Sequence, residues 1–142
     1  MDIASFMRGY KQAWEERDEP LFCAASFADD GAYRHTPLQV QRGRTELAAD
    51  WQRVKLQQDV RPDCELLGAA PGRGVAHWQV EYQVASEALF RIWAASAGTH
   101  QLERKPGEPL PRMVLDGVLS AEFDGEDCRG CRLWWHSMPK AA

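Results

Sequence analysis

The 142-residue sequence lacks the features that mark several large classes of protein. It has no basic run and a formal net charge of -4, whereas a nucleic-acid surface needs concentrated Lys and Arg to neutralise phosphates. No apolar stretch reaches transmembrane length, and the opening Met-Asp-Ile lacks the basic and apolar pattern of an export signal. We therefore expect no nucleic-acid partner, no membrane partner and a cytoplasmic location.

Motifs for common cofactors and nucleophiles are also missing. There is no glycine-rich phosphate loop and no Gly-x-Ser-x-Gly nucleophile motif. Cys128 and Cys131 have the spacing of redox and metal sites, but residues three apart in an extended strand point to opposite faces. Only a turn at Gly130 would bring the two thiols together. We therefore expect no cofactor and no metal ion.

Large aromatic side chains are what the sequence has in abundance. It contains six Trp, five Phe and three Tyr, and 44% of its residues are hydrophobic. A chain of this length is expected to form one domain, residues 1–142, around one core. So many large rings suit either a bulky core or a cavity lined by aromatic side chains.

Helical periodicity dominates the first half of the sequence. Asp18 can cap a second helix that carries Pro20 in its first turn, and a strand is expected over residues 31–36. A third helix is predicted from Gly43 to near Gln58. The first helix presents an apolar stripe of residues at helical spacing, namely Ile3, Phe6, Met7, Tyr10 and Trp14.

The second half follows a period of two, which is typical of strands. Residues 75–84 place their even positions on the core side, and residues 113–123 place their odd positions there. In the last strand Trp135 is expected to face inward and Trp134 outward. Helices followed by an antiparallel or mixed sheet predict an α+β fold. Residues 86–110 interrupt the pattern, and we expect a short helix and loop that folds across a pocket as a lid.

The order of these elements resembles the nuclear transport factor 2-like superfamily, and in particular its SnoaL-like branch. The residues that carry the resemblance are Trp14 with Asp18, the Phe-Ala-Asp-Asp run at 27–30, Gly43, the Leu-Asp-Gly-Val run at 115–118 and the Trp-Trp-His run at 134–136. The resemblance implies a curved sheet that forms a half-cone around the helices, a cystatin-like roll with an internal apolar pocket. It also implies a homodimer paired through the outer face of the sheet, where Trp134, His77 and Val118 are expected.

The same resemblance implies roles for individual residues. Tyr10 falls where ketosteroid isomerases place a tyrosine that donates a hydrogen bond to the enolate oxygen, and His35 falls where they place a carboxylate base. An imidazole with a pKa near ~6.5 can remove a proton beside a carbonyl at neutral pH. The third isomerase position, a protonated acid, falls on Leu119, which cannot donate a hydrogen bond. Steroid isomerisation is therefore not expected.

Three functions stay open from the sequence. The favoured one is binding of a small apolar or aromatic ligand, without established catalysis. An alternative is an isomerase, cyclase or dehydratase with His35 as general base and Tyr10 as donor, and another is a non-catalytic module that dimerises. Both His35 and Tyr10 also have a purely structural interpretation, as buried polar and core aromatic residues. The expected pocket lining is Tyr10, Trp14, Tyr33, His35, Trp51, Trp78, Tyr82, Leu119 and Trp135.

Overall fold

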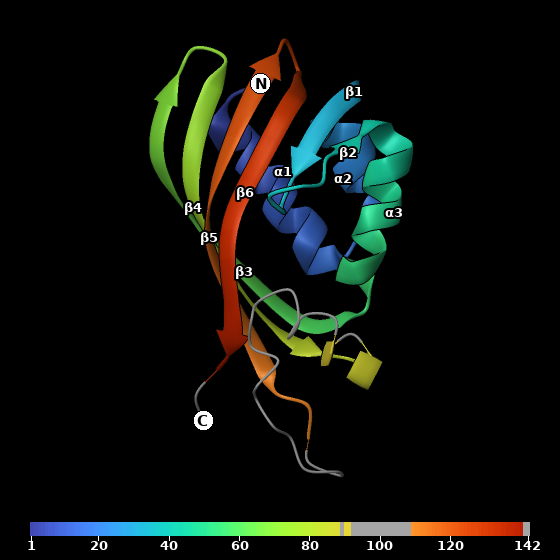
Figure 1. Cartoon of the computed structure of the whole chain (residues 1–142). Coiled ribbons are helices and arrows are strands. Elements are labelled where there is room, and N and C mark those ends of the chain that lie inside the picture. The colour runs from blue at the N-terminus through green and yellow to red at the C-terminus, as the bar shows by residue number, and fades with distance from the viewer. Residues whose placement is uncertain (89, 92–108, 141–142) are drawn as a thin grey trace.

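A curved sheet with helices on one face forms the structure, a computed structural model that describes residues 1–88, 90–91 and 109–140. Figure 1 shows the helices gathered on one side of the sheet. The six strands lie in the order β2-β1-β6-β5-β4-β3, and β1 pairs with β6 in parallel while the other pairs are antiparallel. The elements are α1 (Ile3–Glu16), α2 (Glu19–Ser26), β1 (Phe27–Arg34), β2 (Gln41–Arg42), α3 (Gly43–Lys55), β3 (Gln57–Ala70), β4 (Arg73–Val84), β5 (Arg112–Asp124) and β6 (Asp127–Pro139).

The second helix begins at its predicted cap, and the first helix has an acidic cap that was not predicted. The Asp2 side chain caps α1 by accepting a hydrogen bond from the Ser5 backbone, and α1 ends at Arg17, which has a left-handed φ of 56°. Asp18 caps α2 by accepting from the Leu21 backbone at 3.1 Å, and Pro20 lies in the first turn. The predicted apolar stripe of α1 is fully buried against the sheet.

Helix α3 crosses the same face of the sheet beside β1. Its buried positions are Leu47, Trp51 and Val54, which recur at helical spacing as predicted. The helix ends at Lys55, slightly before the predicted end at Gln58. Its buried stripe faces the rings of α1 and α2, and the Trp51 and Phe22 rings stack with centroids 4.0 Å apart.

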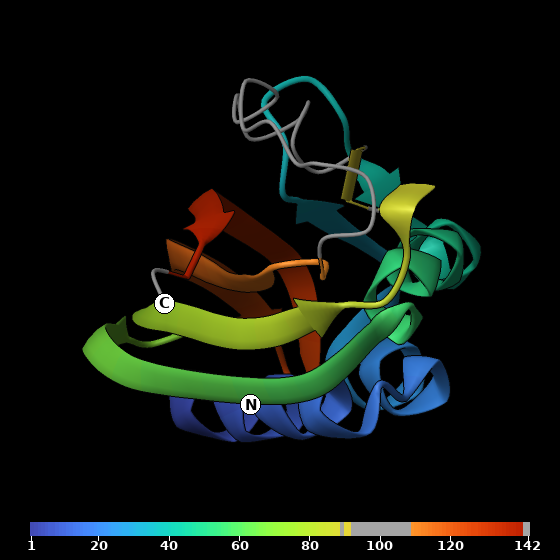
Figure 2. The same cartoon turned by 90° about the horizontal axis from the view of Figure 1, so that it is seen from below.

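The long strands β3 to β6 curve along their length (Figure 2), and β4 and β5 follow the predicted alternation. Even positions of β4 and odd positions of β5 face the helices and are buried. Trp134 is 51% exposed on the outer face, whereas Trp135 packs against the core, so both tryptophan orientations are confirmed. The α+β half-cone predicted from the sequence is the observed architecture.

A β-bulge in β6 changes the prediction for the Cys-x-x-Cys pair. Gly130 pairs with Glu122 and Cys128 pairs with Phe123, so Arg129 is an extra residue without a partner in β5. The extra residue shifts the alternation by one position, and Cys128 and Cys131 are therefore both buried instead of pointing to opposite faces. Burial raises the pKa of the Cys128 thiol to about 12, which disfavours the thiolate that metal binding and redox exchange require.

Two further predictions concern regions outside this core. The proposed lid at residues 86–110 lies mostly outside the described residues, which there include only 86–88, 90–91 and 109–110. Within the ranges that the structure describes, no helix is both long and apolar enough to cross a membrane.

Candidate functional site

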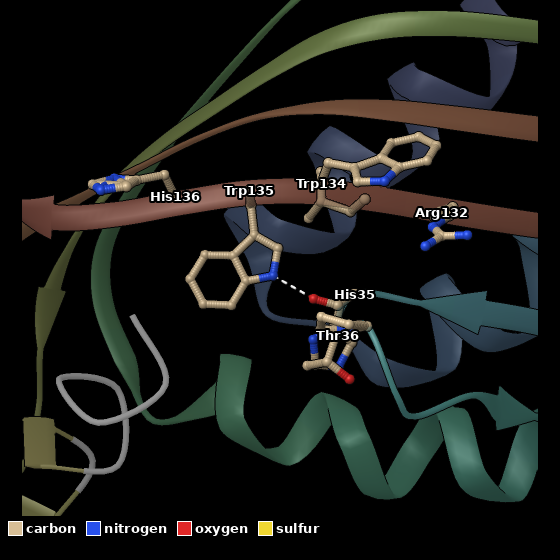
Figure 3. A pocket seen from close by; sticks show the side chains of 8 residues that line it. His35, Thr36, Arg132, Trp134, Trp135 and His136 are labelled. Atoms are coloured by element: carbon tan, nitrogen blue, oxygen red, sulfur yellow. Dashed lines mark hydrogen bonds between the residues drawn. The ribbon is translucent and has the colours of Figure 1, made fainter. Parts of the chain in front are cut away.

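A pocket opens where β1 ends and the chain leaves the neighbouring strand β6. The two strands pair in parallel as far as Arg34 and Arg132, and residues 35–37 then follow a separate path. The space left beside β6 is a pocket of about 470 Å³. The residues around it are drawn in Figure 3, and they are His35, Thr36, Pro37, Arg132, Leu133, Trp134, Trp135 and His136.

The two tryptophans of β6 occupy different walls of this pocket. In Figure 3 they leave the strand on opposite sides, as expected for consecutive strand residues. The Trp135 indole donates a hydrogen bond to the backbone carbonyl of His35, which ties the segment after β1 to β6. The hydroxyl of Thr36 lies in the wall, is buried and has no hydrogen-bond partner in the described part of the chain. The pocket is therefore largely aromatic and contains a few polar groups.

His35 is held by a carboxylate from α3 that sequence reasoning missed. Its Nε2 atom lies 2.7 Å from Asp50 Oδ1, and the two side chains are only 10% and 12% exposed. The other carboxylate oxygen of Asp50 lies 3.4 Å from Nη2 of Arg53, one turn further along α3. A signal for Asp50 exists in the sequence, because it shares the helical stripe of Leu47 and Trp51.

The electrostatics of this cluster favour an ionised carboxylate. Burial alone raises the pKa of Asp50, but the hydrogen bond from His35 and the charge of Arg53 outweigh it and lower the pKa below its usual value. The pKa of Arg53 is raised because its interaction with Asp50 and nearby tyrosines exceeds the opposing effect of burial. Since an ionised Asp50 only accepts hydrogen bonds, Nε2 of His35 carries the hydrogen. In this tautomer Nδ1 is the nitrogen that can accept a proton, which is the arrangement of an oriented general base.

Tyr10, the predicted donor, lies deeper than the pocket. Its hydroxyl is 2.9 Å from that of Tyr33, and both residues are fully buried. Burial raises the pKa of both phenols, so both keep their protons at neutral pH. The Tyr33 ring lies 5.3 Å from the His35 ring, which links the hydroxyl pair to the pocket wall. Tyr10 itself is not among the residues that line the pocket.

The structure divides the predicted lining residues between the pocket and the core. His35 and Trp135 line the pocket. The others are fully buried and packed together, with the Tyr10 and Trp78 ring centroids 4.8 Å apart, and they are Tyr10, Trp14, Tyr33, Trp51, Trp78, Tyr82 and Leu119. In the described residues the indole N–H groups of Trp14, Trp51 and Trp78 have no acceptor. A ligand-binding role for this inner group stays a prediction.

A second histidine pair lies on the outer face of the sheet. His77 Nε2 is 2.5 Å from Asp116 Oδ1, and both side chains are exposed to solvent. Glu81, which lies on the same face as His77, instead pairs with Arg112 and with Lys140, the latter at 2.9 Å. Among the described residues, no His, Cys, Asp and Glu side chains form a group that would hold a metal ion.

Comparison with known proteins defines the fold of the chain. No protein-family model and no curated protein matches the sequence. Solved structures do match. One of them is SalBIII, an epoxide hydrolase/cyclase-like enzyme with a role in pyran ring formation in the polyether salinomycin. Its structure matches with a TM-score of 0.69 at 13% sequence identity, over 96% of this chain and 95% of SalBIII. The chain has a ketosteroid isomerase-like fold. The predicted resemblance is thus confirmed at the level of the fold.

Other structures with this fold differ in what they bind or do. A candidate polyketide cyclase from Pseudomonas putida KT2440 has a TM-score of 0.64 at 17% identity, over 94% of this chain and 91% of its own. A hypothetical protein from Catenulispora acidiphila, solved with trimethylamine, has a TM-score of 0.66 at 12% identity, over 92% and 85%. Because one fold can host unrelated functions, function has to be argued from the residues of this chain.

Proposed function

We propose that this chain binds a small, largely apolar molecule in the pocket between His35 and Trp135. The observation that carries the proposal is the pocket of about 470 Å³ with two tryptophans in its walls. Volumes of this order are typical of ligand sites, which combine apolar walls with few polar groups. Thr36 and His35 supply such groups, and the buried Thr36 hydroxyl has no protein partner among the described residues. A flat ligand with one polar group fits these features.

A fragment screen followed by NMR tests the binding site. We expect binders to shift the indole resonance of Trp135 and the amide of Thr36, while the indole resonances of the fully buried Trp51 and Trp78 stay in place. A Thr36→Tyr variant should fill the pocket and abolish these shifts. Thr45→Tyr, an exposed position on α3, serves as the matched control and should leave binding intact. The site would be disproved if the binders shift only the resonances of Trp51 and Trp78, or if no fragment in the screen shifts the resonance of Trp135.

Proton transfer beside a carbonyl is the second candidate function. The observation that favours it is the 2.7 Å contact between His35 and Asp50, which orients the imidazole as a base. The chemistry would be that of a cofactor-independent isomerase, cyclase or dehydratase. Tyr10 stays a candidate donor, but its hydroxyl would have to exchange the bond to Tyr33 for one to the ligand.

Deuterium exchange in a probe ketone separates catalysis from binding. In D₂O we expect the protein to accelerate exchange of the α-protons of 2-tetralone, followed by NMR, above the rate in buffer. Removal of a general base typically costs about 10²–10⁴-fold in rate, so His35→Gln should lose the acceleration while still binding the ketone. Acceleration that persists in His35→Gln would show that His35 is not the base. If the unmodified protein binds the ketone without accelerating exchange, ligand binding would stand as its function and proton transfer would be excluded for this class of ketone.

Self-association through the outer face of the sheet is the remaining proposal. Trp134, Val118 and Met138 are exposed there on neighbouring strands. Apolar groups gathered on one face favour a protein contact over free solvent. Trp134 also lines the pocket, so this contact would cover one wall of the ligand site.

A further inference from the structure

Two arginines lie side by side next to the pocket: Arg132 lines it, and Arg34 directly precedes the lining residue His35. Arg34 is the last residue of β1, and its register partner on the parallel strand β6 is Arg132. Register partners in a sheet project from the same face, and the strands are about 4.8 Å apart. Tyr33 and Leu133, which precede and follow them, are buried on the inner face, so both arginines project from the outer face.

Neither guanidinium has a protein anion as partner. Within the described residues, neither Arg34 nor Arg132 forms an ion pair or a side-chain hydrogen bond. Several other arginines are paired with carboxylates, among them Arg44, which lies 3.1 Å from Asp29, and Arg129, in the same strand as Arg132, which lies 3.3 Å from Glu122. Since the chain carries a net charge of -4, carboxylates are not scarce. Like charges directly opposite each other on paired strands destabilise a sheet, and this arrangement therefore has a cost in the unliganded protein.

Among the residues that the structure describes, the lining of the pocket beside this pair includes no acidic side chain. Its polar side chains are His35, Thr36, Arg132 and His136. The Arg132 guanidinium carbon lies 4.9 Å from the centre of the Trp134 ring. A guanidinium stacked on an aromatic face keeps its N–H edge free, and that edge matches the geometry of a carboxylate. An anion at this point would satisfy both arginines.

We propose that Arg34 and Arg132 bind the carboxylate of an aromatic acid whose ring occupies the pocket against Trp134 and Trp135. This inference rests on the proposed ligand-binding function and adds the chemical class of the ligand, an organic anion. Affinity should fall as salt is added, because the charges lie near solvent and are screened.

A matched pair of ligands tests the inference. Titration calorimetry and NMR would compare 2-naphthoate with 2-naphthamide, which has the same ring and no charge. We expect the acid to bind about tenfold or more tightly than the amide, as a charged hydrogen bond provides. Arg34→Gln and Arg132→Gln should each remove most of this preference, so that the acid no longer binds more tightly than the amide. Arg129→Gln removes a charge from the same strand and should change neither affinity.

The outcomes separate this inference from the function on which it rests. Equal affinity for both compounds, with Trp135 shifted by each, would overturn the anion site and leave the binding function standing. No shift at Trp135 with either compound would count against both. The free protein offers an independent readout: Arg34→Gln should melt at the same temperature as the unmodified protein or slightly above it, because a like-charge contact is removed. A clear loss of stability would show that Arg34 has a structural role and would overturn the site.

Discussion

Asp50 is the residue that gives His35 a defined chemical role. A histidine at the surface rotates freely and exchanges its proton between two nitrogens. Here the carboxylate accepts from Nε2 and fixes both the ring orientation and the tautomer. Arg53 holds the second carboxylate oxygen, so the Asp50 side chain is itself held in place. Any base chemistry at His35 therefore depends on a residue from a different element.

An Asp50→Asn substitution should expose this dependence. At pH 7 we expect unfolding in urea to show a loss of stability of about 1–2 kcal/mol, because a hydrogen bond to a charged group is weakened. The pKa of Asp50 is lowered in the folded protein, so its contribution is complete above the unfolded value of about 3.9 and is lost as the pH falls through the folded pKa. The difference between the two proteins should therefore shrink steadily below about pH 4.

Two further measurements decide whether Asp50 positions His35 or only stabilises the fold. Nitrogen chemical shifts should report the Nε2–H tautomer of His35 in the unmodified protein and a mixture in Asp50→Asn. Glu65→Gln, an exposed carboxylate on β3, provides the control and should change neither stability nor tautomer. An unchanged tautomer in Asp50→Asn would contradict the positioning role.

The sequence predicted the inward positions of the site but not how the aromatic side chains would share the interior. Strand alternation correctly placed Tyr33 and Trp135 on the helical side of the sheet. Whether the aromatic rings line a cavity or fill it depends on their rotamers and on the distance between α3 and the sheet. The periodicity of the sequence predicts neither of these. Trp51 and Phe22 stack directly, so their rings fill part of the interior where a pocket was predicted. Asp50 was missed because its partner is far away in the chain and on another element.

At the scale of elements, periodicity predicted the helices and long strands well and failed where a strand departs from regular geometry. The helical stripe of α1 and the capping residue Asp18 are both confirmed. The extra residue Arg129 in β6 reverses the expected orientation of one cysteine, because a bulge shifts the side-chain alternation by one position. A single bulge leaves no clear signature in composition.

Gly117 of β5 has no side chain at the point where Trp135, a pocket residue, packs against it. It pairs with Trp78 of β4 on one side and with Trp135 of β6 on the other, so two indoles flank a position without a side chain. A Cβ at this position would collide with the backbone carbonyl of Trp134 and lie 3.1 Å from the Cα and Cβ of Trp135. Most of these atoms belong to the backbone of β6 and cannot move without disturbing the sheet.

A Gly117→Ala substitution should therefore destabilise the protein by about 2 kcal/mol, within the range typical of overpacking. The displaced Trp135 should also weaken ligand binding in the pocket, as measured by the shift of its indole resonance. Gly68→Ala is the control, since a Cβ at Gly68 in β3 has no atom within 4 Å. Chemical denaturation of both variants compares them directly, and equal stabilities would show that β5 and β6 adapt more readily than the contacts suggest.

The whole molecule is asymmetric, because helices cover one face of the sheet and leave the central strands of the other face open (Figure 1). On that open face Val118 lies between His77 of β4 and Trp134 of β6 in the strand register. Met138 and Trp134 are each about half exposed nearby. Beside the His77–Asp116 pair, this face exposes the apolar side chains Val118, Trp134 and Met138. Two copies of the sheet would bury these groups against each other.

We therefore expect a homodimer that dissociates when the centre of this face is charged. Sedimentation equilibrium over a concentration series should give twice the chain mass, and Val118→Glu should give the monomer, because an isologous contact places the same carboxylate on both subunits close together. Leu56→Glu, at an exposed apolar position after α3, changes the charge equally and should remain dimeric. A monomer at every concentration of the unmodified protein would exclude this contact. A dimer that survives Val118→Glu would locate the interface elsewhere on the surface.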